Sequence, residues 1–354
     1  MQMRYTTYYI MIVLAGLLMS CNASEDAHGN QSQTLGLMVD NVNGTETRAV
    51  DGIQDGAFET NENVKIWVWD AGVSKESTAA YSYTSESQSD IQSRVMNVDV
   101  SRTLVPKRPT EGAFRFPRSG SNENKVNIRA CYPVQEQYTS ATDIDMTTLR
   151  TTPGTFTIQT DQSTNEGYKA SDLMYGLPTL GNPVANTNSL VGMTFSHKMA
   201  KVVINITAGQ GITDLTGIDV KLSCVLNAAV TTDANYDMVV EATTGEAIQT
   251  GTVTVNNAEQ VNGQTSVTMS AVLPPQLLVH DNTFITITRG DVTYVYKPTT
   301  DITFLSCSLN TFYITMEEYR LIISGTITPW YNGEGDEFLL TGTIYEVTAR
   351  EENE

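Results

Sequence analysis

The sequence predicts an all-β protein that folds as two antiparallel β-sandwich domains. Thr, Val, Ile and Tyr, which are enriched in strands, are frequent along the whole chain. Short apolar runs, each bounded by Gly, Asn, Asp or Pro, follow one another in the manner of sandwich strands. No long segment carries the 3.6-residue period of an amphipathic helix. The length of 354 residues suits two domains of ordinary size.

The composition narrows the class of function. The chain has 21 Lys and Arg residues against 40 Asp and Glu residues, a formal net charge of −19. Phosphate binding requires a basic face, so this balance argues against nucleic acid as a partner. The sequence has three scattered His residues and shows no clustered carboxylates, Gly-rich phosphate loop or nucleophile motif. We therefore expect no enzyme, no metal site and no cofactor, but an acidic binding or structural protein.

Residues 1–20 predict an export signal. One basic residue, Arg4, precedes an apolar run that has the length of a signal-peptide core and is too short to span a bilayer. The run ends in Leu-Met-Ser directly before Cys21, which resembles a bacterial lipobox. We therefore expect an acylated Cys21 that anchors the protein in the lipid of the outer membrane without a spanning helix. The alternative is an ordinary secretory signal with an incidental Cys.

The segment 21–48 is predicted to be a leader that is removed. It is mostly polar, which is typical of a tether. Within it, Leu35, Leu37 and Val39 alternate as the residues on one face of a strand do. Arg48 before Ala49 suits cleavage by a trypsin-like protease.

The rest of the chain is predicted to form two halves, 49–188 and 189–354, separated by a break rich in Asn and Pro. Many runs alternate between apolar and polar residues, which predicts antiparallel sheets with one face toward water. Two segments, 74–90 and 107–124, are polar and are expected to be irregular. The predicted strands are 64–69, 125–132, 155–160, 193–207, 217–228, 236–241, 251–256, 266–273, 283–288, 292–297, 303–316, 319–328 and 339–348.

An ordered set of motifs resembles the Bacteroidetes fimbrillin family. The run from Ser171 reads Ser-Asp-Leu-Met-Tyr-Gly, and the run from Met193 reads Met-Thr-Phe-Ser-His-Lys-Met-Ala-Lys before a β segment. Near the end, Asn310 begins Asn-Thr-Phe-Tyr-Ile-Thr, and a strand closes with Gly-Thr-Ile-Thr-Pro-Trp at Trp330. Together with the lipobox and the cleavage site Thr47-Arg48, these motifs cover about residues 18–335, and the set is specific as an ordered whole.

The resemblance implies a fold and a mode of assembly. Members of the family are subunits of type V pili, or close relatives, with two transthyretin-like sandwich domains. They are exported as lipoproteins and trimmed by an Arg-specific protease, which implies processing between Arg48 and Ala49. Loss of the leader strand opens a groove in the N-terminal domain, and a terminal strand of another fimbrial subunit fills it by strand exchange. The resemblance also implies that the protein is located at the cell surface and has a role in adhesion to a host or bacterial surface ligand.

The C-terminal extension after Trp330 is the candidate donor strand. It contains the apolar residues Leu340, Ile344 and Val347. The extension is longer than expected after the last strand of the family. Two interpretations therefore stay open, a donor strand and an extra edge strand.

Other residues have functional and structural interpretations. Arg289-Gly290-Asp291 spells an adhesion tripeptide but suits a hairpin turn, and the acidic cluster 334–337 fits a solvated turn better than a calcium loop. His197 is expected to be structural. Trp67 and Trp69 share one face of a strand and favour core packing over sugar stacking. Among the remaining Cys residues, Cys131, Cys224 and Cys307, buried free thiols are favoured over a Cys224–Cys307 disulfide.

Two classes of function remain open. The first is a fimbrial subunit or a related surface adhesin. The second is a surface glycan-binding lipoprotein that does not polymerise. An exposed aromatic platform favours the second class, whereas a leader strand buried in the N-terminal sandwich favours the first.

Overall fold

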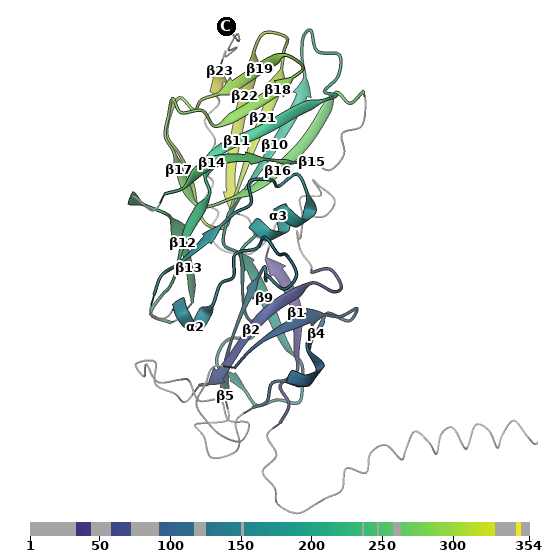
Figure 1. Cartoon of the computed structure of the whole chain (residues 1–354), viewed down its shortest axis with the longest axis vertical. Helices are drawn as coiled ribbons and strands as arrows, with labels where there is room; N and C mark the ends of the chain where they lie inside the picture. The colour runs from purple at the N-terminus through teal and green to yellow at the C-terminus, as the bar shows by residue number, and fades with distance from the viewer. Residues whose placement is uncertain are drawn as a thin grey trace, which may run out of the picture.

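The computed structural model describes most of the chain. The described residues are 33–43, 58–71, 92–116, 125–149, 152–235, 237–245, 248–257, 263–329 and 345–347. They form an elongated molecule in which the N-terminal strands lie at one end and the C-terminal strands at the other (Figure 1). The prediction of an all-β fold is confirmed, since the helices are short and the strands fill both ends.

The elements of the N-terminal part alternate with short helices and turns. In chain order they are β1 (Leu37–Asn43), β2 (Asn63–Asp70), β3 (Gln92–Val98), β4 (Thr103–Pro106), the 3-10 helix η1 (Pro109–Glu111), β5 (Lys125–Tyr132), α2 (Met146–Leu149), β6 (Gly154–Thr157), α3 (Asn165–Ser171), β7 (Met174–Pro178), β8 (Val184–Ala185) and β9 (Val191–His197).

The C-terminal part consists of strands. They are β10 (Ala200–Ala208), β11 (Ile218–Val225), β12 (Asn227–Thr232), β13 (Met238–Ala242), β14 (Thr250–Thr254), β15 (Asn256–Asn257), β16 (Ser266–Leu273), β17 (Gln276–Leu278), β18 (Ile285–Arg289), β19 (Val292–Tyr296), β20 (Ile302–Phe304), β21 (Ser308–Met316), β22 (Leu321–Pro329) and β23 (Tyr345–Val347).

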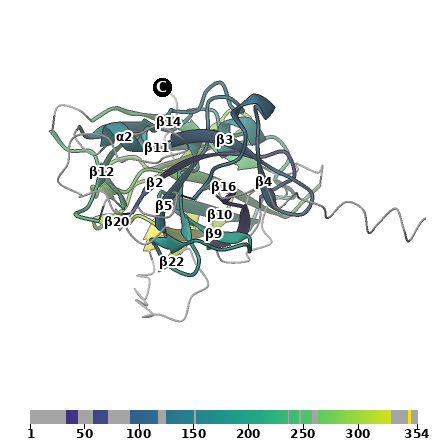
Figure 2. The ribbon, with the colours of Figure 1, turned by 90° about the horizontal axis from the view of Figure 1, so that it is seen from below.

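The N-terminal sheet closes on itself. Its strand order is β2-β3-β4-β1-β9-β7-β5-β8, and β2 also pairs with β5. All of these strands except β8 therefore form a ring, and Figure 2, a view along the long axis, shows β2, β4, β5 and β9 within this part. Closure removes the exposed edges that an open sheet would present to water. The position of β1 between β4 and β9 completes the ring.

The inward residues of the ring form one apolar core. It contains side chains from every ring strand, including Ile66 of β2, Ile128 of β5 and Phe195 of β9, all with no measurable exposure. Phe114 and Phe116 also belong to this core, although they lie in a segment that the sequence predicts to be irregular. Their aromatic rings bury a large apolar area. The sequence pattern does not predict this burial, because the residues around them in the sequence are polar.

The C-terminal part is built mainly from two larger sheets. One has the order β15-β16-β10-β21-β22-β23 and the other the order β14-β11-β18-β19. The apolar side chains of both sheets belong to one buried cluster, as expected for a sandwich. Two small sheets, β13-β12-β6 and β17-β20, complete this part.

The boundary between the two parts differs from the predicted boundary at 188. Strand β9 lies after that boundary but pairs with β1 and β7 in the N-terminal ring. The chain passes from the ring to the sandwich at Lys198 and Met199, between β9 and β10. In the other direction, β6 precedes the predicted boundary but pairs with β12. Both parts therefore exchange strands across the predicted boundary.

Charged side chains tie the two parts together. Arg129 of β5 lies 2.8 Å from Asp237, in the turn region between β12 and β13, and its guanidinium also donates to the Asn235 carbonyl at 3.1 Å. The Tyr175 hydroxyl donates to the same Asp237 carboxylate at 3.0 Å. Because Arg129 is buried, these bonds hold the β12–β13 hairpin against the ring more firmly than an exposed pair would.

Candidate functional site: the β1 strand and its seat

Strand β1 is the sequence-predicted leader strand, and it lies inside the fold. Leu35, Leu37 and Val39 are 3%, 1% and 2% exposed, so the alternation in the sequence corresponds to one inward face. The pairing with β9 shifts register between Val39 and Asn41, which marks a bulge. The bulge adds one residue to the strand, and Val42 therefore also faces the core, at 2% exposure.

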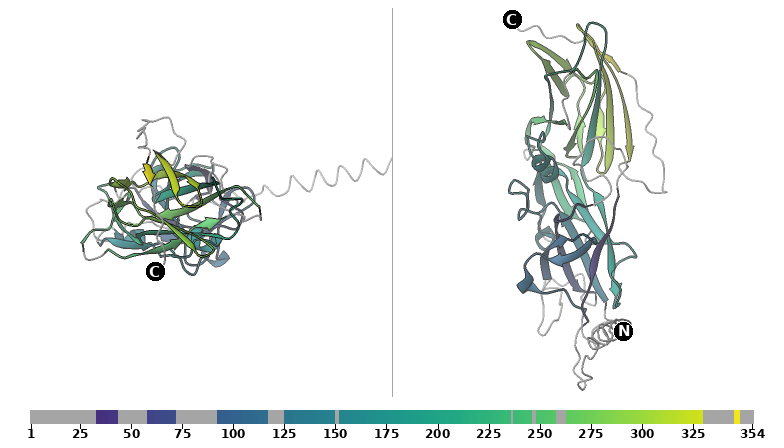
Figure 3. Two further views of the ribbon diagram at one scale, coloured as in Figure 1. Left: turned by 90° about the horizontal axis from the view of Figure 1, so that it is seen from above. Right: turned by 90° about the vertical axis from the view of Figure 1, so that its right-hand side faces the viewer.

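We use the term β1 seat for the space between β4 and β9 that β1 fills. On one side β1 pairs in parallel with β9, from Leu37 opposite Val191 to Asn43 opposite Ser196. On the other side it pairs antiparallel with β4 at Leu37 and Met38 only. The right-hand view of Figure 3 shows β1, in purple, along the length of the N-terminal part beside a teal strand.

Backbone hydrogen bonds extend the β1 seat beyond β4. The Leu35 N–H donates to the Phe114 carbonyl at 2.8 Å, and the Phe116 N–H donates to the Gln33 carbonyl at 2.7 Å. The Val39 N–H donates to the Arg102 carbonyl at 2.8 Å. Such main-chain bonds do not depend on side-chain identity, so the seat can hold any extended segment of suitable shape.

Two glycines permit the close approach of β1 and its neighbour. A Cβ atom on Gly36 would lie 2.7 Å from Cδ2 of Leu190, and one on Gly192 would lie 3.0 Å from Cβ of Asp40. Leu190 is half exposed, so its side chain can move outward, whereas Asp40 lies at the bulge. The seat therefore tolerates a side chain at the Gly36 position at the cost of displacing Leu190.

An empty β1 seat would be costly in water. Removal of β1 exposes the unpaired backbone edges of β4 and β9 and uncovers Met193, Phe195 and Phe116, which are fully buried with it. Each aliphatic side chain of β1 contributes about 1.5–3 kcal/mol by burial. Each buried N–H or C=O group left without a partner costs about 1–3 kcal/mol. A ring that loses β1 therefore favours the capture of another strand.

His197 and Asp172 form a buried pair at the end of β9, the strand that makes the longer pairing with β1. His197 Nδ1 and Asp172 Oδ1 lie 2.8 Å apart, and both residues are buried. The Lys198 N–H also donates to the Leu173 carbonyl at 2.8 Å. The two sequence motifs that contain these residues thus meet in space. The expectation that His197 is structural agrees with this placement, since it fixes β7 against β9.

The remaining leader and tail residues fall mostly outside the described part of the chain. Cys21, Arg48 and Ala49 lie outside it, as do Leu340 and Ile344. Among the candidate donor residues only Val347 lies in a described strand, β23, where it pairs with Leu321 of β22. In the single chain, then, residues 345–347 form an extra edge strand of the six-stranded sheet.

Other candidate sites have structural explanations. Trp67 and Trp69 are 1% and 5% exposed and belong to a buried cluster, so they provide no platform for a sugar. Arg289 ends β18, and Gly290 and Asp291 form the tight turn before β19, with Gly290 at a φ of 59°. The acidic cluster 334–337 lies outside the described residues. Among the residues that the structure describes, no His, Cys, Asp and Glu side chains gather as a metal site.

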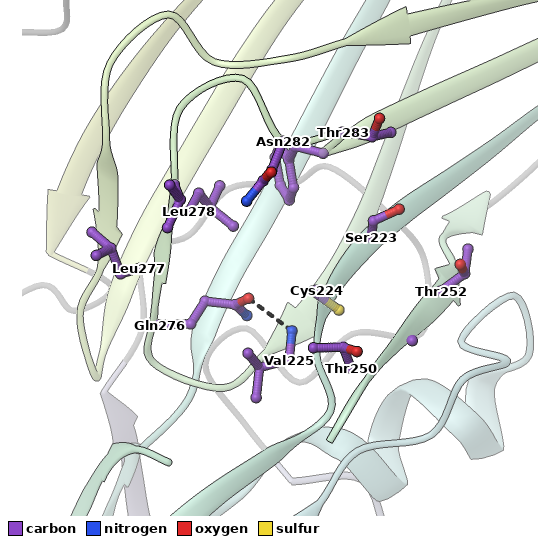
Figure 4. A pocket seen from close by; sticks show the side chains of 13 residues that line it. Ser223, Cys224, Val225, Thr250, Thr252, Gln276, Leu277, Leu278, Asn282 and Thr283 are labelled. Carbon is purple, nitrogen blue, oxygen red and sulfur yellow. Dashed lines mark hydrogen bonds between the residues drawn. The ribbon is translucent and has the colours of Figure 1, made fainter. Parts of the chain in front are cut away.

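A pocket of about 340 Å³ lies on the C-terminal part, beside β11, β14 and β17 (Figure 4). Gln276 ties β17 to the end of β11, because its Oε1 accepts from the Val225 N–H at 2.9 Å. The lining is uncharged and includes hydroxyl groups of Ser223 and Thr252 and the half-exposed Leu277. It provides no carboxylate, amine or imidazole for acid–base chemistry.

We expect two of the three described cysteines to resist thiol reagents. Cys131, Cys224 and Cys307 form no disulfide, and burial raises the pKa of Cys131 and of Cys224 to about 12. At pH 8 both therefore stay almost entirely in the unreactive thiol form. In protein without residues 1–21, native labelling with iodoacetamide should modify Cys307 alone, and all three should react in denaturant. Native labelling of Cys131, measured by mass spectrometry, would contradict the burial.

The comparisons with known proteins agree with this architecture. A family model described as fimbrillin-like matches residues 47–330. The chain belongs to this family. No curated protein matches the chain. Within the described residues, no helix of this fimbrillin-like protein has the length and hydropathy needed to cross a membrane.

Two solved structures resemble the fimbrillin-like chain in fold, and each is described as a "putative cell adhesion protein". The one from Bacteroides ovatus ATCC 8483 has a TM-score of 0.59 and 17% identity, covering 86% of this chain and 99% of the other. The one from Bacteroides uniformis ATCC 8492 has a TM-score of 0.52 and 17% identity, covering 84% and 99%. The tip fimbrial protein Mfa3 from Porphyromonas gingivalis has a TM-score of 0.42 and 11% identity, covering 84% and 99%.

Membership of the fimbrillin-like family supports the coarse functional prediction. It supports a fimbrial subunit role at the cell surface, association with other fimbrial subunits and a function that is not enzymatic. Among the motifs that resemble the family, those in the described residues lie at the junction of β7, β9 and β10 and in the closing strands β21 and β22. The residues of these motifs therefore belong to the strands that surround the β1 seat and to the strands of the sandwich.

Proposed function

We propose that the protein is a structural subunit of a type V fimbria that polymerises by strand exchange at the β1 seat. It is exported as a lipoprotein through Cys21, trimmed after Arg48, and takes part in adhesion. The observation that supports this most is the position of β1. A segment on the leader side of Arg48 forms a wall of the N-terminal ring and buries three alternating residues in its core.

Cleavage after Arg48 changes how β1 is held. Before the cut, the chain keeps β1 at high effective concentration next to its seat, so a strand from another molecule cannot compete. After the cut, only the backbone ladder and the buried side chains retain it. A competing strand can then replace β1 and satisfy the same backbone groups. The fimbrial proposal is tested by cutting after Arg48 and following assembly by electron microscopy, with filaments as the expected result.

The donor in this proposal is the C-terminal extension with Leu340, Ile344 and Val347. A donor at one end and a seat at the other give a heterologous contact, which propagates as a filament instead of closing as a dimer. The ends are suitably placed, because the N-terminal ring and the β22–β23 edge belong to different parts of the elongated molecule (Figure 1). The glycan-binding alternative loses its candidate aromatic platform, because Trp67 and Trp69 are buried.

We expect the change Cys21→Ser to move the protein from the membrane fraction to the soluble fraction. In this proposal the acyl chains on Cys21 supply the membrane anchor. The measurement is fractionation of cells with a high-salt wash, followed by detection with an antibody. Ser20→Ala is the matched control, because it keeps the acylated Cys and a small residue before it. A Cys21→Ser protein that still sediments with membranes would contradict anchoring through Cys21.

A further inference from the structure

The pocket beside β11, β14 and β17 is uncharged in a strongly acidic chain. The chain has a formal net charge of −19, but none of the 13 residues that line this pocket is charged. Hydroxyl or carboxamide side chains make up much of the lining, and they belong to Ser223, Thr250, Thr252, Gln276, Asn282 and Thr283. Such a lining suits a ligand that is neutral and rich in hydroxyl groups.

Most of these polar side chains are available to a ligand. Among the described residues, no hydrogen-bond partner is found for the carboxamide of Asn282 or for the hydroxyl groups of Ser223, Thr250, Thr252 and Thr283. A hydroxyl group can donate one hydrogen bond and accept others, and a carboxamide can both donate and accept. In the empty pocket these groups bond to water, which a ligand hydroxyl can replace.

The backbone of the pocket floor is already paired. Strand β11 lies between β14 and β18, the Ser223 N–H donates to the Phe284 carbonyl at 2.8 Å, and the Val225 N–H donates to Gln276 Oε1 at 2.9 Å. The Gln276 carboxamide also donates to the Pro274 carbonyl at 3.1 Å, so both ends of this side chain are fixed. An extended peptide binds a sheet mainly through free backbone groups at an edge. The floor therefore favours a ligand that side chains recognise.

The pocket places polar and apolar groups close together. Figure 4 shows Ser223, Thr250 and Thr252 on one side, and Asn282 and Leu278 on the other. Leu278 is buried, and the half-exposed Val279 follows it at the same wall. A sugar ring has hydroxyl groups around its rim and C–H groups on its faces, so both kinds of contact serve it in one site.

We propose that this pocket binds a short neutral saccharide. Ser223, Thr252 and Asn282 bond its hydroxyl groups, and Leu278 and Val279 contact its C–H groups. The volume of about 340 Å³ lies at the lower end of the roughly 300–1,000 Å³ of ligand pockets, which suits a short saccharide or the end of a longer one. The inference rests on the proposed role in adhesion and names the class of ligand for it.

The charges of the protein argue against an ionic ligand. A phosphate or a sugar acid finds no Lys or Arg in the lining, and the acidic chain repels anions. An amine finds no carboxylate there. Beside Val279 in the chain, His280 Nδ1 and Asp301 Oδ1 lie 2.7 Å apart, so these two side chains bond to each other.

A single pocket is expected to bind its saccharide weakly. The aromatic residue of the lining, Phe284, is buried in the core of the sandwich, so no exposed ring stacks on the sugar. A fimbria carries many copies of its subunit, and several pockets on one branched glycan raise the apparent affinity. The pocket shares no residue with the β1 seat, so ligand binding and assembly use separate parts of the subunit.

Saturation-transfer NMR on the soluble form, residues 22–354, tests the inference. The neutral probes are the methyl glycosides of glucose, galactose, mannose and N-acetylglucosamine, together with lactose and maltose. The comparison probes are glucuronic acid, glucosamine and an uncharged pentapeptide of alternating Thr and Val. We expect at least one neutral saccharide to bind with a Kd in the millimolar range, and the comparison probes to bind more weakly.

Variants of the lining locate the binding. Asn282→Ala and Thr252→Ala change exposed positions and should each weaken binding of that saccharide by about fivefold. Ser223→Leu should fill the pocket and abolish binding. Thr288→Ala is the matched control, because Thr288 lies on β18 of the same sheet but outside the pocket. Urea unfolding checks that each variant is folded.

The outcomes separate this inference from the proposed function. Equal binding by the native, Asn282→Ala and Ser223→Leu proteins would overturn the pocket as the site. Tighter binding of a charged sugar or of the peptide, or no binding of any neutral probe, would overturn the neutral saccharide. Filaments without saccharide binding would contradict the inference alone. Saccharide binding that depends on the pocket, without filaments after cleavage, would support the inference and contradict the polymerising subunit.

Discussion

Cleavage after Arg48 is expected to convert the monomeric precursor into filaments. The soluble form, residues 22–354, should elute as a monomer, because its own β1 fills the seat. A sequence-specific protease site in place of residues 45–48 allows a cut that leaves the rest of the chain intact. After the cut, native gels should show a ladder of oligomers, and electron microscopy should show filaments. Each junction should dissociate slowly, since a buried strand must be extracted as a whole.

The matched control for cleavage is Arg48→Ala in the native sequence. Limited trypsin treatment should assemble the native chain and leave the Arg48→Ala chain monomeric. Equal assembly of both chains would show that another cut, or none, triggers polymerisation. A cleaved protein that stays monomeric at high concentration would contradict the proposal of a polymerising subunit. It would favour the alternative, a surface lipoprotein that does not polymerise.

The substitution Leu37→Ala, which shortens a buried side chain of the leader strand β1, is expected to destabilise the precursor strongly. Leu37 is 1% exposed in the core of the ring, and Leu→Ala at such sites lowers the free energy of unfolding by about 2–5 kcal/mol. Leu37→Ala should therefore shift the unfolding of the N-terminal ring to lower urea, measured through the aromatic signal of residues 22–354. The cut Leu37→Ala chain should also polymerise faster, because its leader leaves the seat more easily.

Asp40→Ala is the matched control for the leader strand. Asp40 lies on the same strand but is exposed, and exposed substitutions usually change the free energy of unfolding by less than about 0.5 kcal/mol. If Leu37→Ala and Asp40→Ala unfold at the same urea concentration, β1 is not part of the ring core in solution.

Strands with strong local patterns could be predicted from the sequence. The predicted strands 125–132 and 266–273 coincide with β5 and β16, because apolar residues recur at every second position in both and turn residues lie beside them. The sequence did not predict β3 or β4. Gln92–Val98 is half-buried and mixed in character, and Thr103–Pro106 has only four residues. Their strand structure comes from the ring that they join, which is a non-local effect.

The candidate site could be predicted in part. The alternation of Leu35, Leu37 and Val39 correctly indicated a strand, but the observed strand runs to Asn43, because the bulge restores an inward position at Val42. A strict two-residue period cannot show such an offset. Closure of the ring through the pairing of β2 with β5 could not be predicted from the sequence either, since it depends on pairing between distant segments.

The passage between the two parts shows the same limit. The prediction gives 193–207 as one strand, but this segment contains β9 and β10, which belong to different sheets. The ladder of β9 ends at His197, where the buried Asp172 fixes it, and the chain then enters the sandwich. Met193, Phe195, His197 and Met199 are all buried and lie two residues apart, so one alternation continues across the junction and does not show the change of sheet.

A disulfide that locks β1 in its seat tests the central proposal most directly. Met38 and Thr103 are opposite each other on β1 and β4, so Met38→Cys with Thr103→Cys, in a Cys307→Ser background, can link the leader to the ring. The locked protein is cut after residue 48 and followed by electron microscopy before and after reduction. We predict monomers while the disulfide is intact and filaments once it is reduced. Filaments that form at the same rate with the leader still locked would contradict assembly through the β1 seat.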